Sequence, residues 1–321
     1  MILSLKPPYR VTSRILSQIS TISEKLGEVN AAFLSRQSPQ LRKQNRIKTI
    51  HSSLQIEGNT LSFEQVTAIL DGRRVVGPEK DISEILNANK VYENLDNFKY
   101  DSERSFLKAH RILMNRLVQN PGEYRKSGVG IVQGSNIAHV APPHANVPGL
   151  MKDLFQYLKK GDDLDLLKSC VFHYEMEFIH PFLDGNGRMG RLWQTIILMR
   201  KYPVFEFLPF GTLISETQTD YYQALAQSDK EGESTAFIEY MLDVIDGSLS
   251  GLLQISGRIL TEKDRIEYFL SLNRNEFTRK DYMAVFKSIS SATASRDLKR
   301  ALDLGLISKT GSKNTTRYIA R

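Results

Sequence analysis

Twelve residues in the middle of the chain, HPFLDGNGRMGR at positions 180 to 191, combine a histidine, an aspartate, a glycine-rich turn and two arginines. The glycines at 185 and 187 let the backbone turn sharply and approach a ligand closely. Main-chain N–H groups in such a turn, at the start of a helix, form a binding site for an anion. Arg188 and Arg191 are three residues apart and share one face of that helix. Two guanidiniums beside these amides suit a polyphosphate better than a single carboxylate.

Asp184 and His180 supply the other groups that transfer from a nucleoside triphosphate requires. A carboxylate repels phosphate, but it can hold Mg²⁺, which takes one or two carboxylates together with phosphate oxygens. A histidine titrates close to neutral pH and can remove the proton from an attacking hydroxyl. The competing interpretation is a glycine-rich surface turn with solvated charges, which a lone histidine or arginine would favour. The whole set at fixed spacing favours a site for metal-assisted transfer.

HPFLDGNGRMGR resembles, without a mismatch, the H-x-F-x-D-G-N-G-R-x-x-R signature of the Fic family, and the resemblance extends from about Met1 to Leu242. Fic proteins are mostly helical and attach AMP from ATP to a hydroxyl side chain of a target protein. The resemblance implies that His180 is the general base and that Asp184 holds Mg²⁺ (or Mn²⁺) between the α- and β-phosphates. It also implies that the nucleotide contacts the segment Gly185, Asn186, Gly187, Arg188, Met189, Gly190 and Arg191.

Within that segment the resemblance assigns a phosphate to each group. Asn186 and the amides of residues 185–187 would hold the α-phosphate, where charge builds in the transition state. Arg188 would bind the β-phosphate and Arg191 the γ-phosphate. Pyrophosphate would leave.

Two further segments resemble parts of the family's site. GVGIVQGSNIAHVAPPH predicts a small β-hairpin that turns at Gly134-Ser135, similar to the flap that clamps the target as an added strand. TQTDYYQALAQSD resembles the segment that closes over adenine, although ordinary helix packing is an equal interpretation for its tyrosines. The candidates for nucleotide or target contact are Ile137, Ala138, His139, Tyr221, Tyr222 and Asp229. A second catalytic role for His139 is less favoured than a flap contact.

SLQIEGN, residues 53 to 59, places a glutamate at the end of a predicted helix, just before Gly58, a C-cap residue. An acidic group there opposes the helix dipole, and on physical grounds alone it is a solvated side chain. The stretch also matches the Fic inhibitory motif [ST]-x-x-x-E-[GN] as Ser53, Glu57 and Gly58. The resemblance implies that Glu57 pairs with Arg191 and prevents productive binding of ATP. In some members of the family the same glutamate also supports removal of AMP.

Most of the chain is predicted to be helical, because apolar residues recur every three or four positions. Ser62 and Gln65 form a capping box at the start of one helix, and Asp81 is expected to cap another. The motif is expected to form a tight loop between two buried helices, of which the second is LWQTIILMRK. The other expected helices cover residues 13–35, 41–57, 63–70, 104–118, 148–159 and 164–179.

The C-terminal segment, residues 261–321, has 13 lysines and arginines against 7 acidic residues, so it carries +6 of the chain's net charge of +7. Its pattern of helix, capped helix, serine-rich turn, helix and hairpin resembles a winged helix-turn-helix. The predicted recognition helix would expose Arg296, Lys299 and Arg300 toward phosphates. DNA binding and a docking or dimerisation module with a solvated basic face are equal alternatives.

Composition places the chain among soluble globular proteins, with 41% hydrophobic and 25% charged residues over 321 positions. The first residues are too short and too broken for a signal peptide, and no apolar run reaches the ~20 residues of a membrane span. The single cysteine, Cys170, allows no internal disulfide and is expected to be buried. A cytoplasmic protein fits these features.

We therefore expect a mainly α protein with a Fic helical core, a β-hairpin flap and a C-terminal winged helix-turn-helix. The expected domains are an N-terminal helical region with the inhibitory motif (1–100), a catalytic domain (101–246) and the winged helix (261–321). The leading functional hypothesis is a self-inhibited protein adenylyltransferase that modifies a Ser, Thr or Tyr hydroxyl. The alternatives are an ATP-sensing transcriptional regulator and transfer of another group such as UMP, phosphate or phosphocholine. A homodimer is expected from the family.

Overall fold

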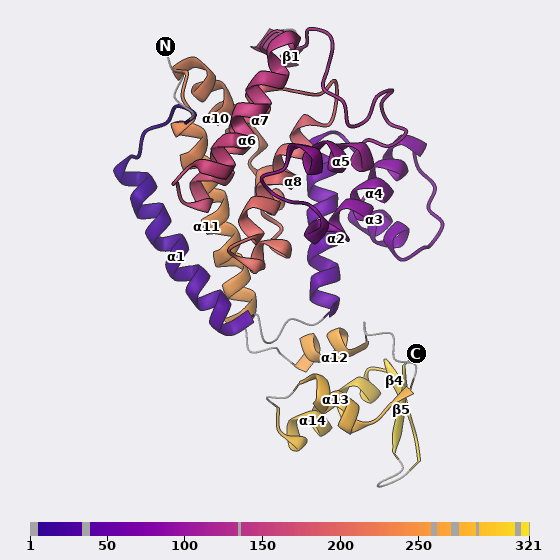
Figure 1. Ribbon diagram of the computed structural model, residues 1–321. Helices are drawn as coiled ribbons and strands as arrows, with labels where there is room; N and C mark the ends of the chain where they lie inside the picture. The colour runs from indigo at the N-terminus through magenta and orange to yellow at the C-terminus, as the bar shows by residue number, and fades with distance from the viewer. Residues whose placement is uncertain are drawn as a thin grey trace. The chain divides into compact units, whose positions relative to one another are not determined.

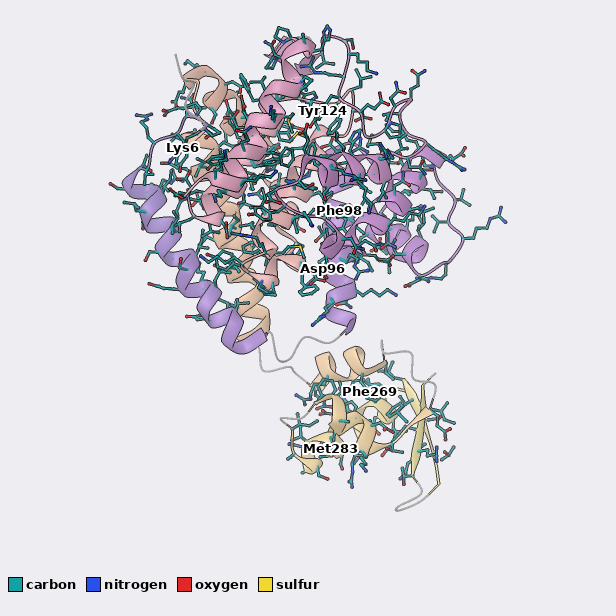
Figure 2. The ribbon with its side chains drawn as sticks, in the orientation of Figure 1. Lys6, Asp96, Phe98, Tyr124, Phe269 and Met283 are labelled. Atoms are coloured by element: carbon teal, nitrogen blue, oxygen red, sulfur yellow. The ribbon has the colours of Figure 1, made fainter. Side chains whose placement is uncertain are left out.

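The computed structural model describes residues 6–33, 39–133, 136–257, 262–270, 276–286, 289–311 and 316–320 (Figure 1). The chain separates into two compact units, Met1–Ile255 and Ser256–Arg321. Side chains fill the interior of each: Phe98 and Tyr124 lie in the first, and Phe269 and Met283 in the second (Figure 2). The predicted boundary between residues 100 and 101 falls inside the first compact unit and stays a prediction.

The first unit is built from helices around one hydrophobic core. They are α1 (Ser13–Phe33), α2 (Pro39–Ile56), α3 (Phe63–Leu70), α4 (Glu79–Tyr92), α5 (Glu103–Leu113), α6 (Val147–Lys160), α7 (Asp165–Ile179), α8 (Asn186–Met199), α9 (Phe210–Glu216), α10 (Gln218–Glu231) and α11 (Thr235–Gly257). Short 3₁₀ turns, η1 (Leu95–Asn97), η2 (His144–Asn146) and η3 (Pro203–Glu206), join some of them.

The helices α7 and α8 form the centre of this unit, and most of their side chains are buried. They approach closely at Gly190, where a Cβ atom would lie 2.6 Å from Cδ2 of His173. A side chain at this position would therefore push the two helices apart. The loop between α7 and α8 is held between two rigid, fully packed elements, which is the arrangement that a precise site requires.

The N-terminal helix α1 runs along α11 (Figure 1). Its buried face contains Ile15, Ile22 and Leu26, and Lys25 on the same helix forms an ion pair with Asp246 at 2.7 Å. Apolar burial supplies most of the stabilisation in such a contact, since partly exposed ion pairs contribute only about 0–1 kcal/mol.

The predicted hairpin consists of β1 (Gly130–Gln133) and β2 (Asn136–Val140), paired antiparallel. Its register is irregular between Ile131 and Val132. The predicted turn residues Gly134 and Ser135 lie outside the described part of the chain. The hairpin has no further strand in its sheet among the described residues, so it presents main-chain groups along its edges.

The second unit contains α12 (Glu262–Leu270), α13 (Arg279–Val285), α14 (Ser291–Asp303) and an antiparallel sheet in the order β3 (Glu276–Phe277), β5 (Arg317–Ala320), β4 (Ile307–Thr310). Its own core includes Phe269, Phe277 and Leu298. Thr278 caps α13 and forms a capping box with Asp281. The predicted mainly α fold with a small β-hairpin is confirmed. In its described residues the second unit has three helices and an antiparallel sheet, and its assignment as a winged helix-turn-helix stays a prediction.

Several predicted boundaries were wrong. The helix expected to be capped by Asp81 begins at Glu79, and the Asp81 carboxylate instead accepts from the main chain and hydroxyl of Thr60. The helix expected to reach residue 118 ends at Leu113, and α14 already includes most of the serine-rich turn. The loop after α7 is shorter than expected, because α8 begins at Asn186. None of the described helices is long and apolar enough to span a bilayer.

Candidate active site

The loop between α7 and α8 changes direction at two residues with left-handed backbone conformations, His180 (φ 48°) and Gly185 (φ 87°). For a non-glycine residue such as His180 this conformation costs about 1–2 kcal/mol, so its surroundings must enforce it. Asn186 provides part of this support, because its side-chain amide donates to the carbonyl of Phe182 and its side-chain oxygen accepts from the N–H of Phe182, both at 2.9 Å. Both polar groups of the Asn186 side chain are therefore in use, and the expected contact with phosphate would be made by its main-chain N–H.

His110 on α5 is a second support, and sequence reasoning missed it. Its ring stacks on that of Phe182 with centroids 3.6 Å apart. Its Nδ1 accepts from the N–H of Gly122 at 2.8 Å, so its Nε2 carries the hydrogen and donates to the carbonyl of Asp184 at 3.0 Å. Burial lowers the pKa of His110 to about 4, and the ring is neutral at physiological pH. A lone histidine in a helix gives no sequence signal for this role.

Arg188 is buried and lies between two carboxylates. Its guanidinium donates to Glu84 on α4 at 2.9 Å and to Asp184 at 2.8 Å. Glu84, which belongs to neither motif, also accepts from the side chain of Asn59 at 2.9 Å. A continuous chain of hydrogen bonds thus joins the end of the predicted inhibitory stretch to the loop through Asn59, Glu84, Arg188 and Asp184.

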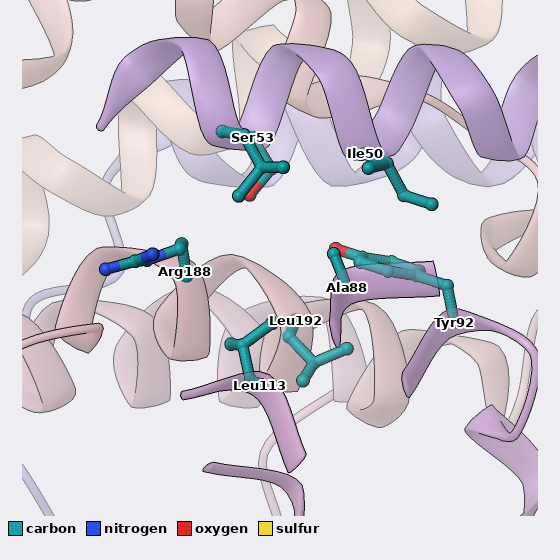
Figure 3. Close-up of a pocket in the computed structure, with 8 residues that line it drawn as sticks. Ile50, Ser53, Ala88, Tyr92, Leu113, Arg188 and Leu192 are labelled. Atoms are coloured by element: carbon teal, nitrogen blue, oxygen red, sulfur yellow. The ribbon is translucent and has the colours of Figure 1, made fainter. Parts of the chain in front are cut away.

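Arg188 also lines a small cavity between α2, α4, α5 and α8 (Figure 3). Ser53 on α2 and Tyr92 on α4 border the same space. The cavity has room for about one water molecule. Within the described residues the buried Nε of Arg188 has no hydrogen-bond partner, and one water in this cavity would satisfy it.

Arg191 is held by the predicted inhibitory stretch, residues 53 to 59. Its Nη2 donates to Oε1 of Glu57 at 2.6 Å and to the carbonyl of Ser53 at 3.0 Å, and its Nε donates to the hydroxyl of Ser53 at 3.1 Å. Burial lowers the pKa of Arg191, but the surrounding groups, Glu57 first among them, together outweigh burial and raise the pKa of the guanidinium. Charge-assisted bonds of this kind are about twice as strong as neutral ones.

Glu57 also lies over the glycine turn. A Cβ atom at Gly187 would collide with Oε1 of Glu57, so the carboxylate occupies the space directly above this turn. Glu57 reaches it because α2 ends in a Schellman motif: Gly58 (φ 86°) donates to Gln55 and Asn59 donates to Leu54. The carboxylate oxygen thus stands where the amides at the start of α8 would receive an anion.

Asp184 fits the role of a metal ligand. Its side chain is 43% exposed, and its Oδ1 accepts from the N–H of Gly185 and from Arg188. Among the residues that the structure describes, no three metal-binding side chains gather. A metal here would therefore complete its coordination with phosphate oxygens and water, which is the usual arrangement for Mg²⁺.

The other predicted nucleotide contacts are placed differently. Met189 is fully buried in the core, and Gly190 lies at the α7–α8 contact rather than at the loop surface. Tyr221 is buried, with its hydroxyl 3.2 Å from Nε2 of His173, which favours the packing interpretation. Tyr222 is 37% exposed, so a contact of its ring with a nucleotide stays a prediction.

Asp229 accepts from the hydroxyl of Tyr174 at 2.9 Å, which gives it a position between α7 and α10. The side chains of Ile137, Ala138 and His139 lie outside the described part of the structure, although their main chain forms β2. The structure therefore brings together His180, Asp184, Arg188, Arg191, Ser53 and Glu57 around the glycine turn.

Comparisons with known proteins identify the family. The Fic/DOC family matches residues 100–198. Curated relatives include a protein adenylyltransferase Fic from Drosophila mojavensis, 25% identical over 77% of this chain and 51% of its own length. Another is protein adenylyltransferase fic-1 from Caenorhabditis elegans, 28% identical over 68% of this chain and 42% of its own. The chain thus spans about half the length of the curated relatives that it matches.

Solved structures give the broader match. A Fic family protein from Desulfovibrio desulfuricans is 38% identical, covers 98% of both chains and has a TM-score of 0.77. Fic-1 from C. elegans, at 22% identity and a TM-score of 0.58, shares the fold over 76% of this chain. Identity and coverage at the level of the Desulfovibrio protein show that the chain belongs to the Fic family.

Proposed function

We propose that this protein is a self-inhibited protein adenylyltransferase, which transfers AMP from ATP to a Ser, Thr or Tyr hydroxyl of a target protein, itself included. The observation that carries the proposal is the pair of Glu57 and Arg191 above Gly187. An anion-binding turn with two arginines is present, and a carboxylate of the same chain fills it. The names of the curated relatives support the activity.

In this reaction His180 takes the proton from the target hydroxyl as the hydroxyl oxygen attacks the α-phosphorus. The bond from that phosphorus to the α–β bridging oxygen breaks, AMP becomes esterified to the target and pyrophosphate leaves. The main-chain amides at the start of α8 stabilise charge on the α-phosphate oxygens. Arg188 and Arg191 bind the β- and γ-phosphates. Bound Mg²⁺ would neutralise charge on the phosphates, and Asp184 is the residue that would hold it.

Self-inhibition follows from competition for one guanidinium. Arg191 cannot pair fully with both Glu57 and a γ-phosphate, and the two anions repel each other in the same space. ATP would bind productively only after Glu57 leaves the turn. The hydrogen bonds of Arg191 to Ser53 hold the end of α2 against α8, and Glu57 directly follows α2.

Labelled ATP tests this function. Glu57→Gly is incubated with Mg²⁺ and ATP that is labelled either at the α- or at the γ-phosphate, alone and in cell lysate. Adenylyl transfer predicts α-label on protein, without γ-label, that survives denaturation. Transfer of γ-label would indicate phosphate transfer, and labelling by UTP in preference to ATP would indicate UMP. Nucleotide binding without any transfer would support an ATP-sensing regulator instead.

A second candidate function, DNA binding, rests on the charge of the second unit. Residues 256–321 carry the entire net charge of +7, since acidic and basic residues balance in the rest of the chain. Arg296, Lys299 and Arg300 are exposed on α14, and none of them forms an ion pair with another described residue. A mobility shift with genomic fragments over a salt series would test it, because phosphate contacts weaken steeply with salt. A homodimer also stays a prediction.

A further inference from the structure

Arg125, in the connection between α5 and the hairpin, is buried and only 3% exposed. Its Nε donates to the carbonyl of His180 at 2.8 Å, and its Nη1 donates to the carbonyl of Ser127 at 2.9 Å. Its Nη2 donates to the carbonyl of Pro142 and, at 3.3 Å, to that of Ile179. Its own N–H donates to the carbonyl of Pro181 at 2.9 Å.

These partners are unusual for a buried arginine, because every acceptor is a main-chain carbonyl. A buried charge is normally stabilised by an opposite charge. No carboxylate among the described residues forms an ion pair with Arg125, and burial lowers the pKa of its guanidinium. The number of donors explains these partners, since a guanidinium has five N–H donors in one rigid plane and can bond four carbonyls, whereas an ammonium has only three donors.

The segments that Arg125 joins belong to two different parts of the site. Ser127 lies just before β1 and Pro142 just after β2, so both ends of the hairpin meet the same guanidinium. Ile179 and His180 end α7, and His180 has the left-handed backbone conformation described above. The base of the hairpin and the main chain of His180 are thereby tied to one side chain.

We propose that Arg125 is a positioning residue that sets the distance and angle between the hairpin and the imidazole of His180. The inference rests on the proposed function, in which His180 removes the proton from the target hydroxyl, and on the expectation that a target segment pairs with the edge of the hairpin. Arg125 touches neither ATP nor the target. It fixes the two segments that do, so that a hydroxyl presented by the hairpin arrives at the base. Arg125 does not contribute to the binding of nucleotide by Arg188 and Arg191.

The test compares Glu57→Gly with double variants that also contain Arg125→Ala or Arg125→Lys. We expect Arg125→Ala to lower kcat about 100-fold while KM for ATP changes less than about threefold, because misplaced reacting groups cost this much. Arg125→Lys, which fits the same space, should also remain well below the parent, since one ammonium cannot bond four carbonyls. Added guanidinium should restore part of the activity of Arg125→Ala. The control is Arg200→Ala, which removes an arginine at the far end of α8 that pairs with Asp165.

Hydrogen exchange supplies a readout that does not depend on activity. In Arg125→Ala and Arg125→Lys, amides of residues 126–146 and 178–184 should exchange at least about tenfold faster, whereas those of α1 and α11 should not change. Unchanged exchange in both segments, or a kcat equal to that of the parent, would overturn the role of Arg125. Absence of nucleotide binding and transfer in Glu57→Gly itself would instead contradict the proposed function, and the exchange result would still decide whether Arg125 couples the segments.

Discussion

Two groups of arginines in this protein are placed in opposite ways. Arg188 and Arg191, at the start of α8, are buried, and each is bonded to a carboxylate from an N-terminal helix, Glu84 or Glu57. Arg296 and Arg300, on α14, are exposed and have no carboxylate partner among the described residues. The first group is buried and its charge is masked, whereas the second is exposed and its charge is not paired with a described carboxylate.

The difference shows what each group can recognise. Buried guanidiniums with fixed positions suit a small polyanion whose phosphates must be placed to a fraction of an ångström. In the proposed function they would bind phosphate only after the masking carboxylate moves, so the same contacts would serve both binding and control. Exposed arginines attract a large polyanion through counterion release and need no release step. The following predictions test these two assignments in order of expected effect.

The largest effect should come from His180, which links the buried arginines to chemistry. In the Glu57→Gly background, His180→Ala should lower the rate of AMP transfer by about 10³-fold, because general-base catalysis contributes about 10²–10⁴. Single-turnover labelling with saturating ATP measures it, and nucleotide affinity should stay within about threefold. A rate within about tenfold of the parent would show that another group removes the proton.

Unmasking Arg191 should have the next largest effect. Glu57→Gly should raise auto-AMPylation about 10²-fold over the wild-type protein, which corresponds to about 3 kcal/mol of released inhibition. Glu57→Gln, which keeps the shape but removes the charge, should give an intermediate rate. Equal labelling of all three proteins would mean that the Glu57–Arg191 pair does not control access of ATP.

The pair of Arg188 with Glu84 should stabilise the folded protein. Glu84→Gln should lower the free energy of unfolding by about 2 kcal/mol, because the buried guanidinium loses its buried carboxylate and keeps only Asp184, whose side chain is 43% exposed. The matched control is Glu93→Gln at the end of the same helix, whose pair with Arg46 is exposed and worth about 0–1 kcal/mol. Urea unfolding measures both, and equal losses would show that Arg188 is not anchored by Glu84.

Acid should loosen the first unit before the second, since all histidines of the chain lie in residues 1–255. The pKa of folded His110 is about 4, below its unfolded value of 6.5, so its contribution is complete above pH 6.5 and is lost as the pH falls toward 4. Between pH 7 and pH 5 this amounts to about 2 kcal/mol. Hydrogen exchange of each unit at the two pH values measures this loss of stability. His110→Gln should remove most of the difference in stability of the first unit between pH 7 and pH 5. Equal sensitivity of the two units would contradict the prediction.

The smallest effect concerns the exposed group. Replacing Arg296 and Arg300 by alanine should weaken binding to double-stranded DNA about tenfold and reduce the slope of log K against log salt by about 2. Arg317→Ala is the control, because Arg317 is exposed but lies 3.5 Å from Glu276. Unchanged binding, or no binding by the wild-type protein at low salt, would assign α14 to another role.

The sequence was sufficient where a local pattern determines structure. The capping box of Ser62 with Gln65 starts α3 as predicted. It failed where several residues offer the same signal. Any serine of the turn before Arg296 could cap α14, and in the structure Ser290 does so by accepting from the N–H of Thr293. Apolar spacing continues beyond Leu113, so periodicity could not locate the end of α5, where the chain turns and Arg116 has a φ of 62°.

The site divides in the same way. The two motifs predicted which side chains surround the glycine turn, and the contact of Glu57 with Arg191 spans 134 positions of sequence. The supports of the loop could not be predicted, because His110, Glu84 and Arg125 belong to no motif and act through contacts that only the folded chain creates. Long-range partners of this kind leave no periodic or spacing signal.

Binding of ATP measured by titration calorimetry tests the central claim most directly. With Mg²⁺ present, Glu57→Gly should bind ATP at least about tenfold more tightly than the wild-type protein. The reason is that Arg191 and the main-chain amides at the start of α8 become free to bind phosphate. Arg191→Ala in the same background should remove most of this gain. Equal affinity of wild type and Glu57→Gly, or no binding to either, would contradict the claim that Glu57 occupies the place of a phosphate.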